Sequence, residues 1–374
     1  MPLNKSPSLR PLGVMFLALF LPSSVYAAYW VYAGSKVRTQ IEKWSQARRE
    51  EGYQVGYDRI DIKGFPLHLD IRIEKPVFRF PEARGGWSWQ TAALDARLSP
   101  LNPRAATISA NSPQTFHPPA NIETGITTLT ATTATAGLVF QDNGSPATVH
   151  VEFGSVRLAG LASGGEVRAR HLKADADWFS PDSPDPANRT MILAAEGRDM
   201  DLPPSLGLPL GPRIEAFALQ AEVHGRIAGE DITQALSDWR QAGGTVDVPN
   251  LLVHWPPVRM HTNGTLALDD QLQPIGAFTA GFQGFFEAVG SFVKQGIIRP
   301  RDASMAKVVL GMLAKTPSGG GVSTVSMPMT LQNRTLYAGP VALIHLPDVR
   351  WSESHHPKPL PQSAGAGATD ETPR

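Results

Sequence analysis

Strict alternation of apolar and polar residues is the feature of this sequence that most constrains its fold. Between residues 57 and 74 one series of positions is apolar, namely Ile60, Ile62, Leu67, Leu69, Ile71 and Ile73. The positions between them are polar or charged, from Asp61 to Glu74. Successive side chains of a β-strand point to opposite faces, so this pattern predicts strands with one apolar and one solvated face. Gly64-Phe65-Pro66 interrupts it and predicts a turn or an edge bulge, because proline cannot donate a ladder hydrogen bond.

The same alternation recurs along the chain, which indicates a sheet of many strands. It is found around residues 149–158, 167–176, 217–227, 246–268 and 325–343. Turn signals separate these segments, so they predict an antiparallel meander and not the alternating strands and helices of a nucleotide-binding sheet. Asn263-Gly264 predicts a hairpin turn, and a change of phase near Arg170-His171 predicts a bulge. We expect two sheet segments that meet near residues 182–212.

Three amphipathic patterns predict short helices in the C-terminal half. The first begins at Asp231, whose side chain can cap it, and stops at Gly243-Gly244. The second spans about residues 281–294 with four phenylalanines, and the third starts after Asp302. Proline and glycine make up about 18% of the chain, against about 12% on average, which disfavours a helical bundle. The predicted fold class is mainly β (α+β): an N-terminal transmembrane helix, then curved antiparallel β-sheets with a few packed amphipathic helices.

The N-terminal segment carries no charge between Arg10 and Lys36, an interval of 25 residues. About 20 residues suffice for a helix to cross a bilayer, and the aromatic residues at its far end resemble an interfacial belt. A cleaved signal peptide ending before Ala28 and a buried core helix are the alternatives. We expect an uncleaved anchor, because the apolar run continues to Ala33. The basic residues after it oppose translocation under the positive-inside rule, so the sequence alone leaves the orientation open.

The chain is expected to divide into six segments. They are a cytoplasmic N-terminus (1–10), the transmembrane anchor or signal peptide (11–35), an amphipathic helix (36–51), an N-terminal β-rich segment (52–200), a C-terminal β-rich segment with helices (201–350) and a disordered tail (351–374). The tail is rich in proline, serine, glycine and alanine, a composition that cannot bury enough apolar surface to fold.

Chemistry-bearing motifs are absent from the sequence. The 34 basic and 34 acidic residues balance, which argues against a nucleic-acid partner. The lack of cysteine excludes disulfides and cysteine-ligated metals. The histidines do not have the spacing of a catalytic zinc site, and no nucleophile elbow or phosphate loop occurs. Asp175 and Asp177 share a strand face, which suits a hydrophilic surface better than paired catalytic carboxylates. We therefore expect no enzyme activity and no cofactor or metal.

Several short motifs carry a family resemblance. The run from Gly52-Tyr53 through Tyr57-Asp58-Arg59-Ile60 to Gly64-Phe65-Pro66-Leu67 resembles alphaproteobacterial membrane proteins grouped as domain of unknown function 2125. Gly86-Trp87-Ser88-Trp89 with Leu101-Asn102-Pro103 is similar to the next segment of that family. The tract 264–269, followed by Pro274-Ile275-Gly276, resembles its C-terminal half and the strand units of AsmA-like envelope proteins. The resemblance covers residues 31–347 and implies an inner-membrane anchor with a periplasmic β-rich domain, but no catalytic residues.

These observations predict an envelope protein that binds a lipid or another amphiphile on an apolar sheet face. A sheet with one apolar face needs a covering layer, and the predicted helices provide little of one for the first strands. The candidate lipid-facing residues are Ile60, Ile62, Leu67, Leu69, Ile71 and Ile73. A closed core between two halves of the sheet, an envelope scaffold with an unidentified protein partner and an envelope hydrolase are the alternatives.

Overall fold

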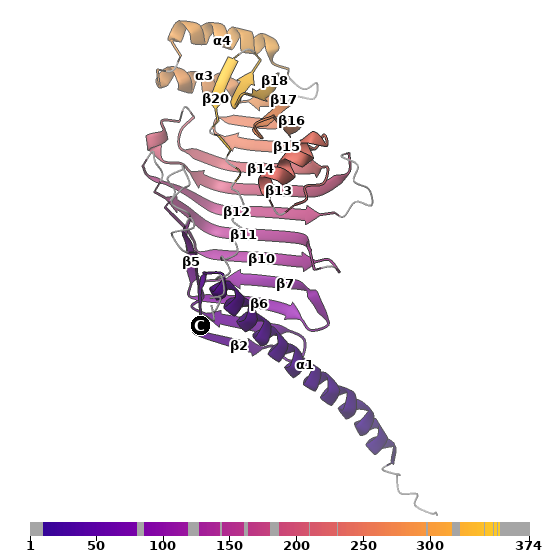
Figure 1. Cartoon of the computed structure of the whole chain (residues 1–374). Coiled ribbons are helices and arrows are strands. Elements are labelled where there is room, and N and C mark those ends of the chain that lie inside the picture. Colours follow the sequence, from indigo (N-terminus) through magenta and orange to yellow (C-terminus); the bar gives the residue numbers. More distant parts are fainter. Residues whose placement is uncertain are drawn as a thin grey trace, which may run out of the picture.

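One antiparallel sheet dominates the chain (Figure 1). The computed structural model describes residues 10–80, 86–118, 127–142, 144–160, 164–179, 187–208, 210–229, 231–296, 298–315, 322–339, 341–346, 348–349 and 351. In these ranges, twenty strands belong to the sheet, and four α-helices and a short 3₁₀ helix accompany it. The predicted mainly β architecture is therefore confirmed.

The strands follow the chain order closely. The first eleven are β1 (Gln54–Gly56), β2 (Arg59–Lys63), β3 (Leu69–Glu74), β4 (Val77–Phe80), β5 (Trp87–Thr91), β6 (Ala93–Ser99), β7 (Asn102–Ala110), β8 (Gln114–His117), β9 (Thr128–Ala131), β10 (Thr133–Phe140) and β11 (Pro146–Ala159). The others are β12 (Glu166–Trp178), β13 (Arg189–Asp201), β14 (Arg213–His224), β15 (Thr245–Trp255), β16 (Val258–Leu268), β17 (Pro274–Gln283), β18 (Val325–Gln332), β19 (Thr335–Ala338) and β20 (Val341–His345). The helices are α1 (Arg10–Glu50), η2 (Pro204–Leu206), α2 (Ile232–Gln241), α3 (Phe285–Lys294) and α4 (Pro300–Leu313).

From β10 to β20 the sheet is a simple meander, in which each strand pairs with the next one along the chain. Several of the earlier strands are consecutive halves of one bent strand. The halves β3 and β4 are hydrogen-bonded to β6 and β5, and the halves β7 and β8 are hydrogen-bonded to β10 and β9. The sheet therefore changes direction along a line, the crease, that crosses these strands (Figure 1).

Three residues with positive φ lie along the crease. Lys75, Ser155 and Asp199 have φ values of 46°, 47° and 50°, which locally reorient the strand. Side chains on the inside of this bend are buried, because two parts of the sheet converge there. Ala131, Val156 and Ala169 form a buried cluster against which Phe153 and Leu172 pack, among others.

A second core lies under α2. Val223 of the sheet and Leu236 and Trp239 of the helix are buried together. As the sequence predicts, Asp231 caps this helix by accepting a 2.8 Å hydrogen bond from the backbone N–H of Gln234. The indole N–H of Trp239 donates to the carbonyl of His224 at 2.7 Å, so the buried indole nitrogen is satisfied.

Four sequence-based expectations need correction. β12 passes Arg170-His171 without a register shift, so no bulge occurs there. The apolar pattern changes phase at this point because the strand bends at the crease, which places Ala169 and Leu172 in the same apolar cluster. Asn263-Gly264 lies inside β16, and the hairpin turns at Pro256-Pro257 instead. β13 and β14 pair along their lengths, so the described strands on both sides of residues 182–212 belong to one sheet and not to two segments. The second helix begins at Phe285, and the residues from 281 to Gln283 belong to β17.

Helix α1 runs without a break through both the predicted anchor and the predicted helix 36–51, and ends just before Gly52 at φ 92°. Among the described residues, no helix combines the length and the apolar character needed for a membrane crossing. The predicted disordered tail lies outside the described residues, apart from Trp351.

Replacing Gly264 by alanine, with Gly290 as the control position, should test whether residue 264 lies in a strand or in a turn. A Cβ on Gly264 would lie 2.3 Å from the carbonyl oxygen of Ala277, whereas one on Gly290 of α3 meets nothing within 4 Å. We expect Gly264→Ala to lower the free energy of unfolding by about 1–3 kcal/mol, the usual range for overpacking. Gly290→Ala should raise it by up to about 1 kcal/mol through helix propensity. Urea denaturation followed by circular dichroism measures both, and a neutral Gly264→Ala would contradict the assigned register.

Candidate functional site

The strand register aligns apolar side chains in a continuous row across the sheet. Directly opposed residues on neighbouring antiparallel strands share a face and lie about 5 Å apart. The central row consists of Ile62, Ile71, Ala96, Ile108, Ala136, Val151, Ala174, Ala195, Leu219, Leu251, Thr262, Ala280 and Met327. It crosses thirteen strands from β2 to β18, and Thr262 is its one polar member.

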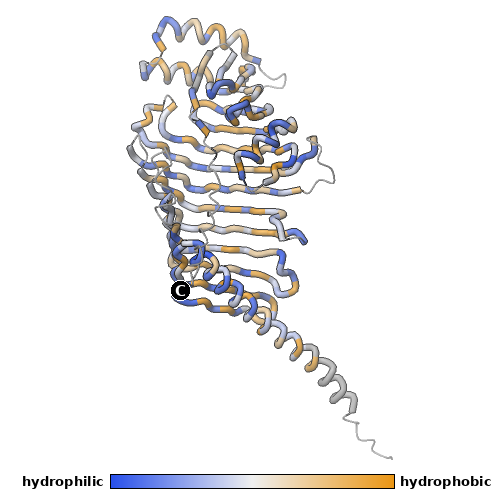
Figure 2. The backbone as a smooth tube through the Cα atoms, in the orientation of Figure 1, coloured by the Kyte–Doolittle hydropathy of each residue, from blue (hydrophilic) through white to orange (hydrophobic). Residues whose placement is uncertain are grey.

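Flanking rows widen this surface on both sides. Toward the crease, the row comprises Ala110, Ala134, Phe153, Leu172, Gly197, Phe217, Val253, Met260, Phe282 and Val325. On the other side, it comprises Leu69, Leu98, Ala106, Leu138, Val149, Ala176, Leu193 and Ala221. We call these three rows together the apolar face. Hydrophobic and hydrophilic residues alternate along the strands that carry it (Figure 2).

Exposure along the central row is highest in the middle of the sheet. Ile71 near one end is 4% exposed and Ala280 near the other is 0% exposed. From Ile108 to Leu251 none of the row's members is buried, and Ala174 is exposed. Alanines occupy three of these middle positions, so the side chains there are apolar and extend only a short distance above the sheet.

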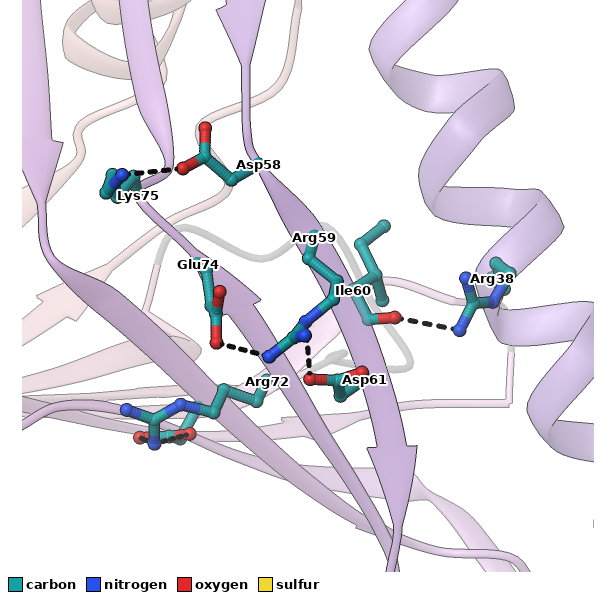
Figure 3. A network of polar contacts seen from close by, with 9 residues as sticks. Arg38, Asp58, Arg59, Ile60, Asp61, Arg72, Glu74 and Lys75 are labelled. Atoms are coloured by element: carbon teal, nitrogen blue, oxygen red, sulfur yellow. Dashed lines mark hydrogen bonds and ion pairs between the residues drawn. The ribbon is translucent and has the colours of Figure 1, made fainter.

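Helix α1 covers the N-terminal end of the apolar face. A Cβ on Gly34 would lie 3.5 Å from a methyl group of Ile62 and 3.7 Å from one of Leu69, so the helix backbone lies close to the sheet. The guanidinium of Arg38 donates to the carbonyl of Ile60 at 2.8 Å, and Figure 3 shows this bond joining the helix to β2. Helix α2 packs on Val223 of β14, with Leu193 of β13 and Val246 of β15 beside it, so it covers one edge of the apolar face on these strands.

The six residues predicted to face a lipid therefore have different surroundings. Ile60, Leu69 and Ile71 are buried, with 3–4% exposure, and Ile62 and Ile73 are half-buried. Leu67 is 66% exposed in the turn between β2 and β3. The open part of the apolar face begins further along the sheet, beyond the strands that α1 covers.

Exposed apolar side chains gather where α1 meets the strand turns. Leu67 and its neighbour Phe65 are more than half exposed in one turn, and Leu101 is 74% exposed in the turn between β6 and β7. The hydroxyl of Tyr26 donates to the carbonyl of Pro66 at 2.6 Å, which ties the helix to the first turn. The hydroxyl of Tyr29 donates to the carbonyl of Pro100 at 2.9 Å, which ties it to the second.

The opposite face of the sheet is polar and carries many ion pairs. At its N-terminal end Arg59 bridges Asp61 at 2.9 Å and Glu74 at 2.8 Å, and Lys75 pairs with Asp58 (Figure 3). One sheet therefore presents an apolar surface on one side and a solvated, salt-bridged surface on the other.

Family membership follows from the comparison with known proteins. The model of a family described as "uncharacterized protein conserved in bacteria (DUF2125)" matches residues 30–347. The chain belongs to this family. The resemblance seen in the sequence motifs is thus confirmed at the level of the family. No curated protein and no solved structure matches the chain.

The DUF2125 chain carries its titratable groups mainly on the polar face. Asp175 accepts hydrogen bonds from His150 at 2.5 Å and from Lys173 at 3.0 Å. Partial burial favours the neutral carboxyl, but the hydrogen bonds from His150 and Lys173 prevail and lower the pKa of Asp175. Asp177, two residues along the same strand, is half-buried.

The titratable groups described on this face include a histidine–carboxylate pair beside a hollow. Within the described residues, no group of three histidines or carboxylates could hold a metal ion. A hollow of about 420 Å³ contains His254, which lies 3.0 Å from Glu215, and Arg198 and Arg259 also line it. No serine or threonine is among its lining residues, so the histidine–carboxylate pair has no hydroxyl nucleophile there to activate.

Sequence reasoning missed the middle of the apolar face, although a signal for it exists. In β10 the alternation reads Thr133, Ala134, Thr135, Ala136, a period of two in residues of weak hydropathy. Alanine and threonine do not stand out as a buried strand face, whereas the isoleucines of β2 and β3 do. The register across neighbouring strands shows that Ala136 belongs to the same row as Val151.

Replacement of Asp175 by asparagine should reduce stability in a pH-dependent way. Its pKa in the folded chain lies below the unfolded value of about 3.9, so its contribution is full above that pH and is lost as the pH falls through the lower folded pKa. We expect Asp175→Asn to lower the free energy of unfolding by about 1 kcal/mol at pH 7. The difference from the native chain should shrink below about pH 4.

Asp177→Asn is the matched control, because it removes a carboxylate from the same face of the same strand. Urea unfolding at pH 7 and pH 3 measures all three proteins. An equal loss from both variants at pH 7 would show that the hydrogen bonds of Asp175 add nothing specific.

Proposed function

We propose that this protein binds a lipid or another amphiphile whose apolar part lies on the apolar face of the sheet. The observation that carries the proposal is the central row, an apolar surface that crosses thirteen strands and has no buried member from Ile108 to Leu251. Monomeric soluble proteins rarely expose apolar patches of more than a few hundred Å² unless the patch binds something.

The chemistry of the face suits an acyl chain. A chain laid along the row would cross a strand about every 4.8 Å and would meet methyl and methylene groups from Ile108 to Leu251. Each buried methylene contributes about 0.8 kcal/mol, so about ten of them would offset a substantial ordering cost. The small side chains of Ala136, Ala174 and Ala195 leave space above the sheet for such a chain.

We further propose that the N-terminal end of the molecule lies on a membrane, with the first part of α1 as an uncleaved inner-membrane anchor and the sheet in the periplasm. Support comes from the exposed side chains of Phe65, Leu67 and Leu101, which would enter the interfacial region beside the helix. Tyr26 and Tyr29, bonded to the adjacent turns, have the amphipathic character favoured at that depth. A lipid could then move from the bilayer to the apolar face.

Neighbouring leucines on β15 offer a test of the lipid site, because they occupy opposite faces. Leu251 belongs to the central row, whereas Leu252 is 44% exposed on the polar face. We expect Leu251→Asp to reduce the lipid that co-purifies with the full chain in mild detergent by about tenfold, since a carboxylate is costly to desolvate. Leu252→Asp should retain lipid at the native level. Mass spectrometry of organic extracts provides the measurement.

A second variant guards against loss of folding. Ala174→Trp keeps the face apolar but fills the space above the exposed middle of the row, so it should also displace lipid while circular dichroism stays unchanged. Native lipid content in folded Leu251→Asp and Ala174→Trp proteins would refute the site. An absence of lipid from the native chain would favour a protein-binding scaffold.

The anchor proposal predicts that the mature protein keeps its N-terminus. Cleavage before Ala28 would remove Tyr26 and its bond to the turn at Pro66. We expect the intact mass of protein purified from bacterial membranes to include residues 1–27, and alkaline carbonate to leave the protein in the membrane pellet. A mature chain that begins at Ala28 would establish a signal peptide instead.

A further inference from the structure

Helix α4 presents an apolar surface to solvent at the end of the sheet farthest from α1 (Figure 1). Spacings of three and four residues place a set of large side chains on its outer side. Their exposed fractions are 72% for Met305, 57% for Val308, 49% for Val309, 80% for Met312 and 56% for Leu313. Such a repeat defines one face of a helix, so the five form a single stripe.

The inner side of α4 is apolar as well. Ala303 is buried and Leu310 is half-buried, and the tip of the Phe286 ring lies 3.7 Å from the position of a Cβ on Gly311, which places α3 directly against this helix. Large apolar side chains on a helix are normally covered, either by a protein core or by a membrane, and the inner side of α4 is already occupied by α3. The outer stripe of α4 therefore lacks the cover that its composition demands.

Charge around the stripe indicates the kind of cover. The chain is neutral overall, but residues 285–315 contain five cationic side chains and only two acidic ones, Glu287 and Asp302. The cationic residues are Lys294, Arg299, Arg301, Lys307 and Lys315. None of them forms an ion pair with another residue in the described part of the chain. Arg299 and Lys315 lie at the two ends of α4, and Arg301 continues the line of the stripe, whereas Lys307 lies on the other side of the helix.

From these observations we propose that α4 docks on an anionic lipid bilayer, with Met305, Val308 and Met312 inserted in the interface and Arg299, Arg301 and Lys315 on the headgroups. An apolar stripe flanked by lysine and arginine is the pattern of helices that lie in a membrane surface. Methionine side chains are flexible and adapt to a fluid surface. A second copy of the chain fits less well as the cover, because the cationic residues around the two stripes would repel each other.

The position of α4 gives this docking a consequence. Twelve strand intervals separate β2 from β18, so the two ends of the sheet are about 60 Å apart at about 4.8 Å per interval. A chain whose N-terminus rests on one bilayer would thus present α4 to a second one. The docking of α4 itself requires neither the anchor nor a lipid on the apolar face, and its test is independent of both.

The absence of cysteine allows site-specific labelling of the full chain. Met312→Cys carries an environment-sensitive nitrobenzoxadiazole probe on the stripe, and Val139→Cys carries the same probe at an exposed position on the polar face. The labelled chains are mixed with neutral phosphatidylcholine nanodiscs, which take up an N-terminal anchor if there is one, and are then titrated with vesicles of 70% phosphatidylcholine and 30% phosphatidylglycerol. Doxyl-labelled lipids in these vesicles quench a probe that enters their bilayer.

We expect emission from the probe at 312 to shift to the blue and to be quenched, while the probe at 139 does not respond. Replacement of Arg299 and Arg301 by glutamine should weaken vesicle binding by about fivefold for each charge, and Arg226→Gln, at an exposed site in the loop after β14, should have no effect. No response at 312, equal responses at 312 and 139, or equal binding to neutral vesicles would overturn the proposal. A shift that depends on protein concentration without vesicles would assign the stripe to self-association instead.

Discussion

Cross-strand pairing of apolar side chains is the interaction on which the rest of this structure depends. Every strand from β10 onward pairs with its chain neighbour, so an apolar side chain in one strand stands directly beside one in the next. A slip of one residue would turn all the apolar side chains of a strand toward the polar face, with its carboxylates and guanidinium groups. The register is therefore fixed strand by strand, and a continuous apolar face is its direct result.

The crease and the helices decide how much of that face stays open. The bend along Lys75, Ser155 and Asp199 brings two parts of the sheet together and buries the side chains between them. Helix α1 covers the first strands, and α2 covers part of the opposite half. The contacts described for these helices do not include the central row from Ile108 to Leu251, which is why the proposed lipid site lies there and not on the isoleucines of β2 and β3.

Both ends of the sheet expose apolar side chains, but from different structural elements. At one end, Phe65, Leu67 and Leu101 are exposed in strand turns beside a helix that carries aromatic residues. At the other, α4 exposes methionine, valine and leucine among cationic residues. Between them runs the apolar face. The proposed path for amphiphiles between two surfaces rests on this arrangement.

The sequence by itself determined the kind of fold and its family. Alternation with a period of two specified strands with one apolar face, and the Asp231 cap specified a helix, because both signals are local. Tertiary structure alone decided which apolar residues are covered: Ile71 and Ala174 belong to the same row, yet Ile71, at the end of the face that α1 covers, is 4% exposed, whereas Ala174 in the middle is exposed. It also showed that Asn263-Gly264, a turn signal by its residues, lies within a strand where Gly264 allows the carbonyl of Ala277 to approach. Such contacts join residues far apart in the chain, and local sequence patterns therefore cannot predict them.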